Sequence, residues 1–299
     1  MGYLFLMLAI LAGMTKGYCG KRTSGYVKEY RDAMLANSIR MVLCIIIGFV
    51  LLIIQNRLPL LKINTQILLI TLFSGICTSV FVVSWLLSVR KGAYMMMDVF
   101  LMMGVIVPLA LSSILFNETV RPNQWIGLAI LLVAVFIMCS YNNSIKEKMT
   151  VSSLILLIIC GITNGLSDFS QKLFVKTVEG GSVSVFNFYT YVFSALALIL
   201  FYIFSSRANK SESSTPPGQL MRRIGLYILI MSISLFAYSY FKTLAAGILP
   251  AAELYPLSQG IGLISATFMS SLLFKEKLTA KCIVGTVIAF IALLIINLL

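Results

Sequence analysis

Histidine is absent from the 299 residues of this chain, and charged residues make up only 11% of them. Without histidine the chain cannot form a Ser-His-Asp or Cys-His nucleophile arrangement, and a histidine-based zinc site is excluded as well. A soluble globular domain has about 25% charged residues, so this composition also excludes the ordinary water-soluble class. We therefore expect a protein that is not an enzyme.

Cysteine is present, but never as a C-x-x-C pair. This spacing is typical of buried packing residues rather than of disulfides or metal ligands. The phosphate-binding motif G-x-x-x-x-G-K-[ST] is missing too, which argues against ATP-driven transport by this chain. We expect no metal and no cofactor. The six cysteines, mostly inside apolar runs, are Cys19, Cys44, Cys77, Cys139, Cys160 and Cys282.

Apolar residues make up 60% of the chain, and the mean hydropathy is +0.99. A helix needs about 20 mostly apolar residues to cross a hydrocarbon core of about 30 Å. The apolar runs at 42–54, 126–139 and 282–299 are long and unbroken, unlike the alternating strands of a membrane barrel. The sequence therefore predicts an all-α, multi-pass protein of the cell (cytoplasmic) membrane.

Hydropathy and chain breakers predict about ten transmembrane helices. We interpret the first as a retained helix and not a signal peptide, because it lacks a basic start and has Lys16 before any plausible cleavage site. The predicted ranges are 2–19, 33–54, 65–89, 93–116, 122–141, 151–171, 183–205, 223–243, 250–273 and 279–298.

The chain contains an internal repeat. Residues 112–120 (SSILFNETV) recur as 270–278 (SSLLFKEKL) with five of nine positions identical, and 12–17 (AGMTKG) is echoed by 160–165 (CGITNG). We infer two copies of a five-helix unit, 1–145 and 146–299. Because each copy has an odd number of helices, the second enters the membrane upside down, which gives the two inverted five-helix repeats of many secondary transporters.

These features resemble the drug/metabolite transporter (DMT) superfamily, EamA type. The similarity rests on the five-plus-five layout, the Leu-Phe-x-Glu phrases ending at Glu118 and Glu276, Arg40 early in the second helix, and Pro256. It spans nearly the whole chain and implies transport, often export, of metabolites, amino acids or drugs, with the binding cavity between the halves. The first-half position equivalent to Pro256 is Asp98, so a shared proline role is not expected.

Charged side chains within membrane helices usually face the bundle interior or a wet cavity. Trp85 and Asp98 lie at about the same predicted depth on adjacent helices, and an aromatic face beside a carboxylate suits an ammonium or amphipathic cation. The alternative is that Asp98 lies at a water-filled end and pairs with Arg90 or Lys91.

Lys242 and Glu253 have matching depths around the second-half turn, so they are candidates for a buried ion pair. Such a pair lines one end of an alternating pathway or is purely structural. Tyr255 and Gln259 follow Glu253 on the same helix, and we interpret them as a cavity wall.

Arg40 lies one turn after Asn37 in apolar surroundings. It is a candidate for holding a substrate carboxylate, and together with Asp98 it describes a zwitterion site; the alternative is that it snorkels to lipid head groups. The corresponding region of the second copy contains the neutral Asn187.

Other polar residues are expected to have structural roles. Asp168 and Lys172 are spaced i, i+4 in the order that favours a local salt bridge. Lys16 is close enough to the interface to snorkel. Glu118 and Glu276 are expected to act as caps or salt-bridge partners.

The formal net charge of +13 does not indicate nucleic acid, because the Lys and Arg residues lie in short connections, where they set topology and contact anionic head groups. Most of them lie after the odd-numbered helices. The positive-inside rule then places both termini outside the cell, whereas the family resemblance favours termini inside.

The sequence thus predicts a secondary transporter that moves a small metabolite, amino acid or amphipathic cation by alternating access. Export coupled to protons or another ion is one form; exchange and facilitated diffusion fit equally well. The alternative is a flippase or carrier for a lipid-linked head group. Membrane lipids and a small-molecule substrate are the expected partners, and the protein is a monomer or homodimer.

Overall fold

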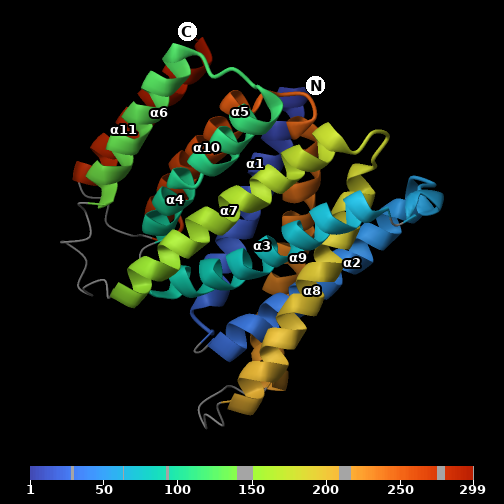
Figure 1. The fold of residues 1–299 in the computed structure, drawn as a ribbon. Coiled ribbons are helices and arrows are strands. Elements are labelled where there is room, and N and C mark those ends of the chain that lie inside the picture. The colour runs from blue at the N-terminus through green and yellow to red at the C-terminus, as the bar shows by residue number, and fades with distance from the viewer. Residues whose placement is uncertain are drawn as a thin grey trace.

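The computed structural model describes residues 1–27, 30–62, 64–91, 94–139, 151–208, 217–274 and 280–298. Its regular elements in these ranges are helical (Figure 1). They are α1 (Gly2–Ser24), α2 (Tyr30–Ile54), the short 3₁₀ helix η1 (Leu58–Leu60), α3 (Thr65–Lys91), α4 (Tyr94–Met103), α5 (Ile106–Phe116), α6 (Pro122–Cys139), α7 (Val151–Thr177), α8 (Val183–Ala208), α9 (Pro217–Ala246), α10 (Ala251–Leu272) and α11 (Ala280–Leu298).

The predicted helix 93–116 is broken into α4 and α5. Pro108 has no backbone N–H with which to bond the carbonyl of Gly104, and that carbonyl instead accepts from Val107 N at 3.1 Å, a tighter turn. The break therefore lies at Gly104 and Val105, four residues before the proline.

Six helices are long and apolar enough to cross a membrane: α1, α2 and, within α3, α7, α8 and α9, residues 65–88, 154–177, 183–204 and 220–246. Shorter apolar helices cover 100–116, 122–134 and 283–296. Large apolar side chains such as Ile46, Phe49 and Ile53 on α2 are exposed, which suits a surface that faces lipid rather than water. The all-α membrane class is confirmed.

The helices pack in a pattern with two-fold character. The α1–α9 contact corresponds to α7–α3 when the halves are exchanged, and α2–α9 corresponds to α8–α3. The pairs α2–α8, α4–α10 and α6–α11 each correspond to themselves. Figure 1 shows α6 and α11 side by side at one end of the bundle and α2 and α8 at the other. The largest hydrophobic core contains buried residues of α1, α2, α3, α4, α7, α8, α9 and α10.

Candidate functional site

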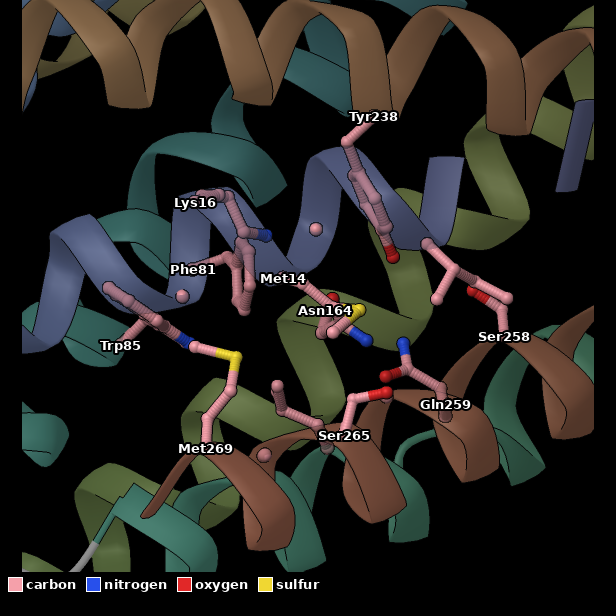
Figure 2. Close-up of a pocket in the computed structure, with 16 residues that line it drawn as sticks. Met14, Lys16, Phe81, Trp85, Asn164, Tyr238, Ser258, Gln259, Ser265 and Met269 are labelled. Carbon is pink, nitrogen blue, oxygen red and sulfur yellow. The ribbon is translucent and has the colours of Figure 1, made fainter. Parts of the chain in front are cut away.

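A cavity lies among α1, α3, α4, α7, α9 and α10 (Figure 2). The space within it that the centre of a water molecule can reach is about 60 Å³. Phe81, Trp85 and Tyr238 provide aromatic rings, while glycines and methionines provide much of the remaining wall. The polar lining side chains are Lys16, Asn164, Ser258, Gln259 and Ser265.

Equivalent positions of the sequence repeat line this cavity together. Lys16 corresponds to Asn164 in the first repeat phrase, and both contribute to the wall. Leu101 corresponds to Gln259 in the register that aligns Glu118 with Glu276, and these also contribute. The cavity therefore lies where the two halves of the chain face each other.

Lys16 is the cationic residue of the described cavity lining. Its Nζ lies 4.5 Å from the ring centre of Tyr238, 5.7 Å from that of Phe81 and 6.0 Å from that of Trp85. Rings at these distances attract an ammonium through their negative faces. The sequence interpretation of Lys16 as an interfacial residue is wrong. Two features of the sequence pointed to the cavity: the equivalence of Lys16 to Asn164, and the aromatic residues in α3 and α9.

Trp85 lies in the cavity wall, and its indole occupies the space beside Gly20. A Cβ atom at Gly20 would overlap the indole ring, so the absence of a side chain there allows the ring to reach the cavity. Asp98 belongs to α4, but its side chain lies outside the described residues. The predicted pairing of Trp85 with Asp98 therefore stays a prediction.

Lys242 pairs with Asp168 and not with Glu253. Its Nζ donates to both Asp168 carboxylate oxygens at 2.8 Å and to the Tyr238 hydroxyl at 2.8 Å, and its side chain is fully buried. Glu253 instead accepts a 2.7 Å hydrogen bond from the hydroxyl of Tyr3 on α1. The predicted Lys242–Glu253 pair is wrong, because α9 turns this lysine toward α7.

The predicted Asp168–Lys172 salt bridge is wrong as well. Because α7 continues to Thr177, well past the expected end at 171, Lys172 lies in a packed helix and not at a helix end. Its Nζ contacts Glu118 at 2.9 Å and the carbonyls of Ala246 and Leu249 at 3.1 and 2.8 Å. Asp168 therefore pairs with Lys242 of α9, and Lys172 pairs with Glu118 of the α5–α6 connection.

Asp168 joins several elements behind the cavity wall. Its backbone carbonyl accepts a 2.8 Å bond from the hydroxyl of the buried Tyr255, and its carboxylate lies 3.5 Å from Nε2 of Gln259. Gln259 is therefore part of the wall, as predicted, whereas Tyr255 lies behind it. Figure 2 shows the amide groups of Gln259 and Asn164 pointing toward each other across the space.

Asn37, Asn187 and Arg40 do not line this cavity. Asn37 donates to the carbonyls of Ala33 and Val82, at 2.9 and 3.2 Å. The side chain of Asn187 donates to the carbonyl of Val183 at 3.0 Å and accepts from the hydroxyl of Ser239 at 2.5 Å. Arg40 is only 3% exposed, which contradicts the snorkelling alternative. Within the part of the chain that the structure describes, its Nε and Nη1 have no hydrogen-bond partner.

Glu118, in the connection between α5 and α6, has the structural role expected of it. It accepts the backbone N–H of Ala251 at 2.8 Å at the start of α10, and it contacts Lys172 at 2.9 Å and Lys176 at 3.4 Å. Burial by itself raises the pKa of this carboxyl, but the bonds from Ala251 and Lys172 outweigh it, and the pKa lies below its ordinary value. Glu276 lies outside the described residues.

Comparison with known proteins places this chain in a family. The sequence model of the EamA-like transporter family matches residues 1–140 and again residues 151–298. The chain belongs to the EamA-like transporter family. It is therefore a multi-pass membrane transporter of the drug/metabolite type, and a small-molecule substrate and membrane lipids are its partners.

The fold of this EamA-like transporter is also found in a solved crystal structure described only as that of a protein. The two share 12% sequence identity with a TM-score of 0.73, over 99% of this chain and 96% of the other. At that identity the similarity shows the fold alone. Among curated proteins no sequence match is found.

Proposed function

We propose that this EamA-like transporter is a secondary transporter of the cytoplasmic membrane, which moves a small organic molecule by alternating access. The observation that supports this is the cavity lined by equivalent positions of both halves. A site between two repeats is exposed first to one side and then to the other when one repeat rocks against its partner. The cavity is the substrate site in this proposal.

The lining favours a substrate with an aromatic or apolar body and hydrogen-bonding groups. Phe81, Trp85 and Tyr238 provide stacking surfaces, and Asn164 and Gln259 provide amide donors and acceptors. Amino acids, other small metabolites and amphipathic cations with such a body stay the proposed substrate classes. Asp98 remains the residue that we propose for proton coupling in the first half.

A lipid-linked substrate needs a lateral apolar opening joined to a polar site. The structure has an apolar groove on the side of the bundle, lined by residues that include Val80, Val83, Leu156, Leu198 and Phe201. None of the groove's described lining residues belongs to the cavity. We therefore keep the soluble substrate as the proposal.

The experiment is a thermal-shift screen of the detergent-purified protein against amino acids, organic acids, amines, nucleosides and cationic drugs. A ligand that binds only the folded state raises the apparent unfolding temperature. A compound that raises it is then tested for uptake or efflux in proteoliposomes. Shifts from lipids alone, with no response to soluble compounds, contradict the proposal.

The cavity is tested with Gln259→Ala. Loss of one hydrogen bond costs about 1 kcal/mol and weakens binding about fivefold, so the thermal shift should need about five times more ligand. The matched control is Gln66→Ala, which removes an exposed glutamine bonded to the carbonyl of Thr177, outside the cavity. Equal effects of the two variants would place the ligand elsewhere.

A further inference from the structure

The repeat makes two helix contacts of the structure equivalent. Gly104, at the α4–α5 break, corresponds to Gly262 on α10 in the register that aligns Glu118 with Glu276. Gly161 and Gly165 on α7 correspond to Gly13 and Gly17 on α1 in the separate register that aligns residues 12–17 with residues 160–165. The packing of α4 and α5 on α7 is therefore the counterpart of the packing of α10 on α1.

The first of these contacts is closed. A Cβ atom at Gly104 would overlap the carbonyl of Gly161, and one at Gly165 would overlap the carbonyl of Gly104. A Cβ at Gly161 would lie 2.5 Å from the carbonyl oxygen of Phe100. Backbone touches backbone here, which only glycine permits.

The second contact is open in the same structure. A Cβ atom at Gly262 would meet no atom within 4 Å, and one at Gly13 would meet only the ring of Tyr238, at 3.2 Å. Gly13, Gly17 and Gly262 all line the cavity. The same three positions are thus glycine in both halves. Gly104, Gly161 and Gly165 are in backbone contact, whereas Gly262 meets no atom and Gly13 meets only a side chain.

We infer that Gly13, Gly17 and Gly262 form a closed contact in the second state of the alternating-access cycle, when the cavity opens to the other side of the membrane. In that state the cavity side of α10 packs on α1 as α4 and α5 pack on α7 in the structure described. The inference rests on the proposed alternating access. In the structure described, nothing sterically requires glycine at Gly262. In the other state, Gly262 would approach the backbone of α1 as closely as Gly104 approaches the backbone of α7 in the structure described, and only glycine permits that approach.

The test uses Gly262→Ala, because the added methyl fits the present state and obstructs only the closed contact. The matched control is Gly225→Ala on α9, where a Cβ would meet only Met221 at 3.9 Å. The reporters are Val107→Cys beside the closed contact and Ser265→Cys, its repeat equivalent, in the cavity wall. Each is introduced into a full-length chain without its native cysteines, and its rate of labelling by a water-soluble maleimide is measured.

We expect Gly262→Ala to slow labelling of Val107→Cys at least fivefold, without slowing that of Ser265→Cys and with an unfolding temperature near that of the parent. Gly104→Ala, which obstructs the contact already made, should do the reverse and slow labelling of Ser265→Cys. Gly225→Ala should leave both rates unchanged.

Two contrary results have different meanings. If both reporters are labelled in the parent chain and Gly262→Ala alters neither rate, the glycine contact is wrong while alternating access stands. If Val107→Cys is never labelled in the parent chain while Ser265→Cys is, the second state does not form, and the proposed function fails together with the inference.

Discussion

The Asp168–Lys242 ion pair shows how single residues are held in this bundle. Both side chains are almost completely buried, and the lysine has three oxygen partners at 2.8 Å. Removing one partner of such a pair leaves a charge without compensation in a low-dielectric interior, at a cost of about 3–5 kcal/mol.

We therefore predict that Asp168→Asn lowers the unfolding temperature strongly, because Lys242 loses its counter-charge. The double variant Asp168→Asn, Lys242→Met should recover most of the loss, since the uncompensated charge is then removed as well. Thermal unfolding of the two single variants and the double variant in detergent measures the coupling. Additive losses would show that the two charges do not depend on each other.

At the scale of helices, Glu118 joins three elements: it belongs to the α5–α6 connection, caps the start of α10 and contacts lysines of α7. The repeat phrase predicted a structural role but not these partners.

An i, i+4 spacing states which residues share a face of one helix. It does not state which neighbouring helix that face meets, and for this reason Lys172 was assigned to Asp168.

The lowered pKa of Glu118 leads to a prediction about pH. The ordinary value is 4.5, and a carboxyl whose folded-state pKa is lower contributes stability that is present above the ordinary value and is lost as the pH falls through the folded-state value. Glu118→Gln should therefore destabilise the protein at neutral pH. Its difference from the parent should shrink as the pH falls below about 4.5, as followed by unfolding temperature against pH. A difference that does not change with pH would contradict the ionised role.

At the scale of the whole molecule, the membrane orientation is a prediction from charge. The distribution of Lys and Arg places the connection that contains Gly25 in the cytoplasm and the one that contains Asn64 outside. In whole cells expressing a chain without native cysteines, an impermeant maleimide should label Asn64→Cys and not Gly25→Cys. Gly25 tolerates the change, since a Cβ there meets nothing within 4 Å. The reverse labelling pattern would place both termini inside.

The sequence by itself determined the class of this protein and the existence of most of its helices. In a bilayer each helix satisfies its own backbone hydrogen bonds and needs only sufficient apolar length, so the signal is local. The break at Gly104 was missed because an apolar run shows length but not the tight turn that Pro108 causes. The repeated phrases indicated two related halves, because a repeat is also visible along the chain.

Only the tertiary structure decided which side chains meet. Asp168 had both Lys172 and Lys242 as conceivable partners, and the choice depends on how α7 faces α9, which no spacing along the chain specifies. Lys16 lines the cavity, where rings from α3 and α9 lie around its ammonium. Contacts between helices depend on how their faces are turned in space, and that is fixed only when all the helices pack together.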